Sequence, residues 1–344
     1  MADPLVVIDA DVLGRHRTGD ETYVEQLLRA LPAVADGLRL AAVTRRPERV
    51  PEGVEPIHLP ARSQELRMAW SLPRLLRRLR PALAHFVHAL PLAPPDRTVV
   101  TVQDLSFERH PSLMPRKDRL VFRFVVPRAA RGAARVFAVS ERTKRDLVEL
   151  YRIPSDRIVV TPLAADAAFS PGANGRRDYL LFVGAIEPRK DPLAAAEAAR
   201  AVGLPLVVVG PAKDAALAAE LARRGADLRG YVSKDELVRL YQETACLVWP
   251  SRYEGFGLPV LEAMACGAPV VAAPDPAVRE VAGDAALFAD PPELAGAVRR
   301  ALAERERLSA AGLARARAFS WAETARRTVV VYREILGLHG ATSE

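Results

Sequence analysis

The sequence has only two cysteines, Cys246 and Cys266, among 344 residues. Both lie in apolar stretches (ETACLVW and EAMACGAP), a setting typical of small buried hydrophobic side chains. Two cysteines so placed supply too few ligands for a zinc site, so they indicate no metal centre.

Long hydrophobic runs and stacking aromatic residues are also missing. No stretch of about 18 apolar residues occurs, which argues against a membrane-spanning helix. Residues 1–25 lack the basic, apolar and small-residue pattern of a signal peptide, so we expect a cytoplasmic protein. Aromatic residues make up 6% of the chain and show no stacking pattern, which argues against single-stranded nucleic acid as a partner.

The hydrophobic residues that are present make up half of the chain, and its length predicts about two domains of roughly 150 residues. Short β-branched runs without polar alternation predict strands buried on both faces. These predicted strands are Leu5–Ile8, Leu38–Val43, Val99–Val102, Val136–Val139, Ile158–Val160, Tyr179–Val183, Leu206–Val209, Leu247–Trp249 and Val270–Ala272. The predicted helices are Thr22–Leu31, Glu141–Tyr151, Leu193–Val202, Ala215–Arg224, Asp235–Ala245, Leu258–Ala265, Glu293–Glu304 and Trp321–Leu336. This alternation predicts an α/β fold with parallel sheets.

The positive net charge of +7 is confined to the first half of the chain. Residues 1–170 hold 27 Lys and Arg against 20 Asp and Glu, whereas residues 171–344 hold 22 of each. An anionic partner of the first half would explain the excess, either a phosphorylated acceptor or an anionic membrane surface. Nucleic acid is the other usual interpretation of a high isoelectric point, and an arginine-rich solvated surface would give the same counts.

The clearest site signal is the segment YEGFGLPVLEAMACGA, residues 253–268, which follows a strand and begins a helix. Gly255 and Gly257 allow a tight turn close to a ligand, and Pro259 fits the first turn of a helix. The amides around Phe256, Gly257 and Leu258 then point out of the helix N-terminus, where a phosphate can bind.

Two carboxylates frame this segment. Glu254 lies in the loop before the helix, and Glu262 lies about one turn inside it. Both can accept hydrogen bonds from hydroxyls of an elongated ligand, such as the sugar and the ribose of a nucleotide sugar. The plain alternative is a solvated loop glutamate and a helix glutamate in a salt bridge.

A second signal, GAIEPRKD over residues 184–191, follows the strand YLLFV directly. In an open α/β sheet, ligands bind where strands end. Arg189 can bind a diphosphate bidentately and Lys190 adds a point charge. A solvated basic turn would be the structural alternative.

These segments, together with GYVSKDELVRLYQETACLVWPS, resemble the retaining glycosyltransferase family 4, which has the GT-B fold. The family spaces two glutamates as E-x7-E, as Glu254 and Glu262 are here. The resemblance extends over essentially the whole chain and is most specific over residues 180–275. It implies two Rossmann-like domains whose parallel sheets face each other across a cleft.

The resemblance also implies a role for each matching residue. Glu254 would bind hydroxyls of the transferred sugar, and Glu262 would bind the nucleotide ribose. Arg189 and Lys190 would neutralise the diphosphate as it leaves. Further donor contacts would come from Gly184, Gly255, Phe256, Gly257, Leu258, Tyr231 and Val232.

No metal and no other cofactor is implied, since the usual Asp-x-Asp pairing does not appear beside the PRK loop. Cationic side chains and a helix dipole would stabilise the leaving charge instead. Retention of the anomeric configuration is likewise implied by the family.

The first half matches the family less closely. HRTGDETYVEQLL resembles a segment that faces the donor phosphates; Gly19 is kept, but Glu21 stands where a second glycine is common. VVTVQDLSFERHP resembles a strand that ends in His-Asp near the transferred sugar. Here Gln103 replaces that histidine before Asp104, so this position can hydrogen-bond a hydroxyl but cannot act as a base.

We therefore expect an acceptor-side domain over residues 1–170 and a nucleotide-sugar-binding domain over residues 171–320. A Gly- and Pro-rich break at Ser170–Arg177 separates them. A C-terminal helix within residues 321–344 is expected to pack back on the first domain. The expected function is transfer of a hexose, with GDP-mannose as the guessed donor, to a saccharide or lipid-linked acceptor. The alternatives are a nucleotide-sugar epimerase and a non-catalytic module that binds anions or a membrane surface.

The basic excess includes the segment Arg62–Arg80, which carries six arginines. Leu72, Leu75, Leu76 and Leu79 follow helical spacing, and Arg74, Arg77 and Arg78 fall off that stripe. One interpretation is a core-facing helix with a solvated basic face. The other is that this face, with Arg116–Arg135, holds the protein peripherally at the inner face of an anionic membrane.

Overall fold

The computed structural model describes residues 3–15, 18–61, 63–113, 116–172 and 178–338. Arg62 of the basic segment and residues 173–177 of the expected linker lie outside them. The chain forms two compact units. The first comprises Met1–Glu108, Met114–Leu163 and Trp321–Glu344, and the second comprises Arg109–Leu113 and Ala164–Ser320, as far as these are described.

The first unit is built on a seven-stranded sheet in the order β3-β2-β1-β4-β5-β6-β7. All of its paired strands run parallel. The strands are β1 Leu5–Asp9, β2 Arg39–Thr44, β3 Glu55–His58, β4 Leu83–Val87, β5 Thr98–Val102, β6 Arg135–Ala138 and β7 Ile158–Val160. The strand order reverses between β1 and β4, so their carboxyl ends border the crevice where open α/β sheets bind ligands.

The second unit repeats this plan with a six-stranded parallel sheet in the order β10-β9-β8-β11-β12-β13. Its reversal lies between β8 and β11. The strands are β8 Leu180–Val183, β9 Leu206–Val209, β10 Asp227–Gly230, β11 Cys246–Trp249, β12 Val270–Ala272 and β13 Leu287–Phe288. The expected α/β fold with two parallel sheets is confirmed.

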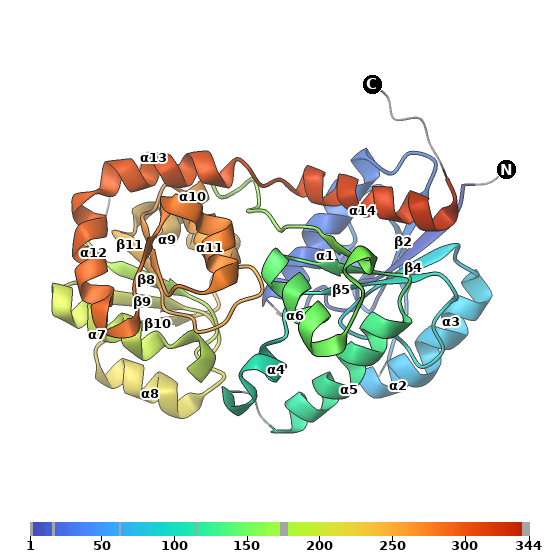
Figure 1. The fold of residues 1–344 in the computed structure, drawn as a ribbon, viewed down its shortest axis with the longest axis horizontal. Helices are drawn as coiled ribbons and strands as arrows, with labels where there is room; N and C mark the ends of the chain where they lie inside the picture. The colour runs from blue at the N-terminus through green and yellow to red at the C-terminus, as the bar shows by residue number, and fades with distance from the viewer. Residues whose placement is uncertain (1–2, 16–17, 62, 114–115, 173–177, 339–344) are drawn as a thin grey trace. The chain divides into compact units, whose positions relative to one another are not determined.

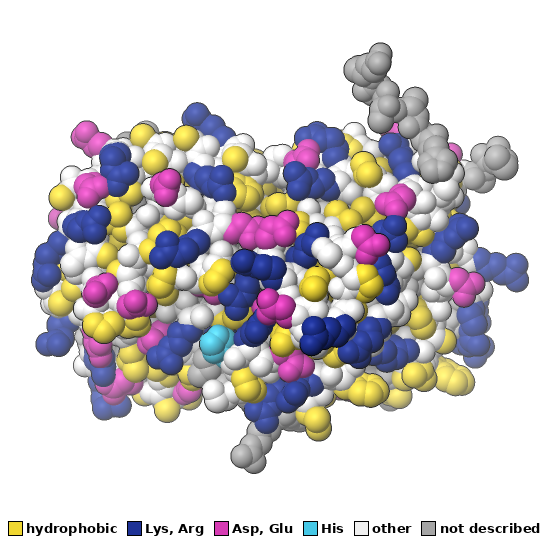
Figure 2. All heavy atoms as spheres, viewed as in Figure 1, with side chains coloured by type: hydrophobic (Ala, Val, Ile, Leu, Met, Phe, Trp, Pro, Cys, Tyr) yellow, Lys and Arg dark blue, Asp and Glu magenta, His cyan; other side chains and the backbone are white. Residues whose placement is uncertain are grey.

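Helices surround each sheet (Figure 1). They are α1 Thr18–Ala30, α2 Gln64–Leu66, α3 Leu72–Leu79, α4 Ser106–Arg109, α5 Arg116–Gly132, α6 Glu141–Tyr151, α7 Pro192–Val202, α8 Ala215–Arg223, α9 Lys234–Glu243, α10 Leu258–Ala265, α11 Pro276–Ala282, α12 Leu294–Ala303, α13 Arg305–Ala316 and α14 Trp321–Leu336. Among the described residues, no helix combines the length and the hydropathy needed to cross a membrane. Lysine and arginine side chains are visible over both units (Figure 2).

Four strands were missed in the sequence: β3, β4, β10 and β13. Residues of β3 and β10 are largely exposed or half-buried because these strands lie at sheet edges, so the two-sided apolar pattern is absent. Strand β4 is central and buried, but His85 interrupts its apolar run.

Helix α14 is packed into the first unit through a chain of buried hydroxyl and imidazole groups. The Tyr332 hydroxyl lies 2.5 Å from His85 Nδ1, and His85 Nε2 lies 2.7 Å from Thr101 Oγ1. The Tyr23 hydroxyl of α1 lies 2.7 Å from the same Thr101 oxygen. Burial lowers the pKa of His85 to about 3, so the imidazole stays neutral at physiological pH.

Tyr332→Phe should destabilise the protein by about 1–3 kcal/mol, because it removes the partner of a buried imidazole nitrogen. Chemical denaturation monitored by circular dichroism measures this loss. Val330→Ala is the matched control, since Val330 lies on the same helix but is 64% exposed; it should change the free energy of unfolding by no more than about 0.5 kcal/mol. Equal effects of the two substitutions would contradict a stabilising role for the network.

His85 should also make stability depend on pH. The unfolded chain binds a proton at His85 near pH 6.5, whereas the folded chain does so only near pH 3. The contribution of His85 to the free energy of unfolding is therefore fully present above pH 6.5. It is lost as the pH falls toward 3, by up to about 1.4 kcal/mol per pH unit. The variant His85→Gln lacks the titrating group, so the difference in free energy of unfolding between the wild type and this variant should shrink as the pH falls. A difference that does not change with pH would show that burial does not suppress protonation of His85.

Candidate active site

The loop after β8 brings the two predicted cations to the strand reversal of the second unit. Gly184 begins this loop beneath the Trp249 ring: a Cβ at that position would lie 2.9 Å from Trp249 Cη2, so a larger residue would not fit. A 3₁₀ turn, Pro188–Lys190, then carries the cations and leads into α7. The loop after β11, which carries Tyr253–Leu258, lies at the same reversal.

The two loops are joined by ion pairs around Glu254. Lys190 Nζ donates to Glu254 Oε1 at 2.6 Å, and Arg189 Nη1 lies 3.6 Å from Glu254 Oε2. Arg189 Nη1 also donates to the Tyr253 carbonyl at 2.6 Å. The side chains are mostly buried, with exposed fractions of 12% for Lys190, 16% for Arg189 and 9% for Glu254. The geometry therefore places both predicted cations beside the first glutamate of the pair.

A third carboxylate, Glu187, completes this cluster and was not singled out in the sequence. It accepts from Arg189 Nη2 at 2.8 Å and from Lys213 Nζ at 3.2 Å. Burial raises the pKa of Glu187, but the nearby cations Arg189, Lys213 and Lys190 more than offset that effect, so its pKa is lowered and it stays ionised. The GAIEPRKD segment gave no reason to separate this glutamate from ordinary loop charge.

Lys190 also lies against an aromatic ring. Its ammonium sits 4.5 Å from the centre of the Trp249 ring, a cation–π arrangement. Burial lowers its pKa, and the attraction of Glu254 only partly compensates. A cation that is this poorly hydrated gains most when further negative charge arrives beside it.

Helix α10 supplies the second glutamate. Gly257 precedes the helix with φ of +106°, a backbone region that favours glycine. Glu262 is in the middle of α10, and its Oε2 accepts a hydrogen bond from the Tyr241 hydroxyl at 2.9 Å. Burial raises the pKa of Glu262 to about 7, although the Tyr241 bond opposes the shift.

The structure thus brings together most of the predicted donor-binding positions of the second unit. These are Gly184, Arg189, Lys190, Glu254, Gly255, Phe256, Gly257, Leu258 and Glu262, all from the loops after β8 and β11 or from α10. Tyr231 and Val232 follow β10, which β9 separates from β8. Tyr231 is 53% exposed there.

In the first unit, the predicted positions gather where β4 and β5 end. A Cβ at Gly19 would lie 3.6 Å from Gln103 Oε1, so these two predicted residues are neighbours. Asp104 accepts from the Ser106 amide and hydroxyl, each at 2.9 Å, and so caps the following turn.

His88 follows β4 at the same edge of the sheet. Its Nε2 is 3.3 Å from Asp20 Oδ1. Burial lowers the pKa of His88, but Asp20 more than reverses this, so its pKa is raised. The backbone of His88 is left-handed, with φ of +61°, and no residue pattern in the sequence indicates this conformation.

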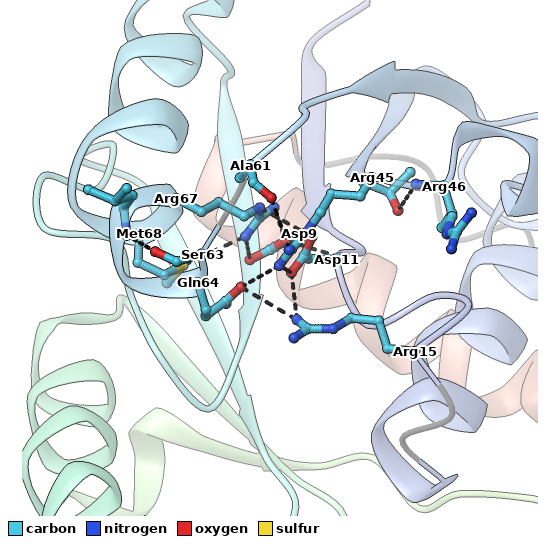
Figure 3. Close-up of polar contacts among 12 residues, drawn as sticks. Asp9, Asp11, Arg15, Arg45, Arg46, Ala61, Ser63, Gln64, Arg67 and Met68 are labelled. Carbon is cyan, nitrogen blue, oxygen red and sulfur yellow. Dashed lines mark hydrogen bonds and ion pairs between the residues drawn. The ribbon is translucent and has the colours of Figure 1, made fainter.

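A further polar cluster follows β1 and was missed entirely (Figure 3). Asp9 accepts two hydrogen bonds from Arg67, at 3.0 and 2.5 Å, and Asp11 accepts two from Arg45, each at 2.7 Å. Arg67 is fully buried. Its partners lie about sixty residues away in sequence, so no local motif marks it.

Two family models match the chain. Residues 17–169 match the model described as Glycosyltransferase Family 4. Residues 165–315 match the model described as Glycosyl transferases group 1. The two matches together cover residues 17–315, which include most of both units.

Two curated relatives are similar in sequence. The O-antigen chain mannosyltransferase B of Escherichia coli is 32% identical over 270 residues, which cover 69% of this chain and 70% of the relative. A D-inositol 3-phosphate glycosyltransferase of Frankia alni is 35% identical over 243 residues, and the match spans about three-fifths of each protein, 60% of both.

A solved structure of Anabaena HepE in complex with UDP and glucose superposes with a TM-score of 0.70 at 15% identity, covering 96% of this chain and 99% of the other. At that identity the likeness speaks for the fold. Together with the family models and the E. coli relative, it leads to one assignment: the chain belongs to the glycosyltransferases, with a family 4 domain followed by a group 1 domain.

Proposed function

We propose that this glycosyltransferase moves a hexose from a nucleoside-diphosphate sugar to a saccharide or lipid-linked acceptor, with retention and without a metal ion. The mannosyltransferase relative supports a mannose donor, for which GDP-mannose is the natural form to test first. The UDP and glucose in the Anabaena structure support a nucleoside diphosphate as leaving group. The inositol phosphate named for the Frankia relative supports an anionic acceptor.

The observation that carries this proposal is the cluster of Arg189, Lys190 and Glu254 at the strand reversal. Bond cleavage would leave a full extra negative charge on the diphosphate. Two poorly hydrated cations and the N-terminus of α10 lie in the same unit to stabilise it. Preorganised charge of this kind favours the transition state over bound donor.

Glu254 suits hydroxyl binding better than nucleophilic attack. Its carboxylate is held between Lys190 and Arg189, so a nucleophilic attack by Glu254 would have to break these ion pairs. Its oxygens still have lone pairs that can accept hydrogen bonds from sugar hydroxyls. Glu262, held by Tyr241, is proposed to accept from the ribose hydroxyls.

The first unit is proposed to contribute Gly19, Gln103 and Asp104 near the transferred sugar or the acceptor. His88, whose pKa Asp20 raises, could supply the imidazole that the family histidine would otherwise provide. The epimerase and the non-catalytic module are not favoured, because both halves of the chain match glycosyltransferase models.

The direct test is a thermal-shift panel of nucleotide sugars, followed by assays of donor hydrolysis and of sugar transfer with candidate acceptors. The anomeric configuration of the product, read by nuclear magnetic resonance, tests retention. A stabilising donor with no hydrolysis and no transfer to any acceptor would argue against the proposed reaction.

Glu254→Gln should lower kcat, because Glu254 is proposed to touch the reacting sugar. Glu262→Gln should mainly raise the donor KM. The wild-type donor KM should also fall as the pH rises from about 6 to about 8, because ionised Glu262 is the better acceptor and its pKa is about 7; Glu262→Gln should abolish that dependence.

Glu306→Gln, at an exposed glutamate of α13, is the matched control and should behave as wild type in both parameters. Circular dichroism and the melting temperature of each variant check its fold. Wild-type kinetics in well-folded Glu254→Gln and Glu262→Gln would remove both residues from the donor site.

Arg189→Ala should lower kcat on the order of a hundredfold, because it removes charge stabilisation that is greatest in the transition state. Activity should persist in EDTA. An unchanged kcat with weaker donor binding would reduce Arg189 to an anchor, and strict dependence on a divalent cation would refute the metal-free mechanism.

A further inference from the structure

Large hydrophobic side chains that stay exposed are concentrated in one part of the first unit. This apolar patch consists of Leu66 (60% exposed), Trp70 (65%), Leu92 (68%), Leu120 (73%), Val121 (52%) and Phe124 (71%). Scattered exposed apolar residues are ordinary, but a contiguous group indicates a binding surface.

Hydrogen bonds show that the three segments carrying this patch are neighbours. The Leu92 amide donates to the Met68 carbonyl at 2.9 Å, which joins the loop after β4 to the turn between α2 and α3. Arg128 Nη2 of α5 donates to the Leu92 carbonyl at 3.0 Å. Figure 2 shows hydrophobic side chains along the edge where Figure 1 places α2 and α5.

The exposure of Leu66 and Trp70 is fixed by the fold. Between them lies Arg67, which is fully buried and bonded bidentately to Asp9 at the end of β1 (Figure 3). Arg67 begins a π-helical turn, Arg67–Ser71, that leads into α3. Because this ion pair fastens the turn to the sheet, Leu66 and Trp70 project outward from a rigid support.

On both helical segments, exposed arginines follow the exposed hydrophobic residues along the same helix face. Along the first helical segment, Leu66 and Trp70 are followed at four-residue intervals by Arg74 and Arg78, all exposed. On α5, Leu120 and Phe124 are followed at the same interval by Arg128. Residues four apart lie on one face of a helix, so each stripe passes from apolar to basic.

Carboxylates are few in the sequence of these segments: α2 contains Glu65 and α5 contains Asp118, and Arg123 of α5 is paired with Glu108 at 3.1 Å. Residues 66–92 contain five arginines and no Asp or Glu, and residues 119–128 contain three arginines and no Asp or Glu. A protein partner would meet a rim of mixed polar groups, whereas a bilayer with anionic headgroups presents charge of one sign together with an apolar interior. A surface with apolar anchors and a predominantly basic surround fits the bilayer.

We propose that the apolar patch and the arginines Arg74, Arg77 and Arg78 dock the first unit on an anionic phospholipid bilayer. Trp70, Leu66 and Phe124 enter the headgroup–acyl boundary, as the apolar faces of interfacial helices do. Each arginine near the surface contributes roughly fivefold to partitioning. The bilayer would bring a lipid-linked acceptor to the unit that carries the net positive charge. This consequence for the acceptor rests on the proposed function, whereas the docking itself does not rest on it.

Co-sedimentation with vesicles tests this proposal without any donor or acceptor. One set of vesicles contains phosphatidylcholine alone, and the other contains equal parts of phosphatidylcholine and phosphatidylglycerol. At low salt the full-length protein should bind the anionic vesicles at least about tenfold more strongly, and added salt should weaken that binding. Failure of sugar transfer with retained vesicle binding would count against the proposed function alone.

Two variants separate the apolar and the basic contributions. The double substitution Trp70→Ser with Phe124→Ser should reduce binding to the anionic vesicles on the order of tenfold or more. It should leave the salt dependence of that binding unchanged. Arg74→Glu with Arg77→Glu and Arg78→Glu should reduce it on the order of a hundredfold. The control for the apolar variant is Val330→Ser, at an exposed apolar site on α14. The control for the arginine variant is the equal charge change Arg223→Glu with Arg239→Glu and Arg317→Glu, at exposed sites in the second unit.

Both controls should bind as the wild type does, and melting temperatures confirm that each variant is folded. Equal binding of the wild type to neutral and anionic vesicles would overturn the proposal, as would wild-type binding by either patch variant. A patch-dependent dimer in analytical ultracentrifugation, without vesicle binding, would assign the surface to contacts between copies of the chain instead.

Discussion

The central strands of both sheets are buried on their two faces, and that constraint decides where the chemistry of this protein can lie. When helices cover both faces of a parallel sheet, polar side chains are left mainly in the loops at the ends of its strands. Where the strand order reverses, adjacent loops diverge and leave room for a ligand. Arg189, Lys190 and Glu254 meet at such a reversal in the second unit. In the first unit, Asp9 ends β1 and His88 follows β4, the two strands at its reversal.

The sequence predicted the elements whose own residues carry the full signal. LLFV and LVVV are uninterrupted apolar runs, and the structure has strands there. The helix Leu258–Ala265 was predicted to the residue, because Gly257 and Pro259 mark its start. Strands β3 and β10 lie at edges and keep polar residues, so no two-sided pattern could reveal them.

The site was predictable as a set of residues but not as a set of contacts. The PRK loop and the spaced glutamates were visible in the sequence, yet the 2.6 Å bond between Lys190 and Glu254 joins residues 64 positions apart. Glu187 and His88 have no distinctive neighbours in the chain; their pKa shifts arise from Arg189 and Asp20 beside them after folding. Arg67 looked like one arginine among six, and its complete burial depends on Asp9 of a distant strand.

The placement of α14 has a consequence for how the chain is made. The first unit contains both β1 and α14, so the 157 residues Ala164–Ser320 are an insertion within it. During synthesis from the N-terminus, the partners of Tyr332 emerge from the ribosome long before Tyr332 itself. His85 and Thr101 therefore lack Tyr332 until α14 has been made, while the second unit already has its whole sheet available. The unit made first is the one that finishes folding last.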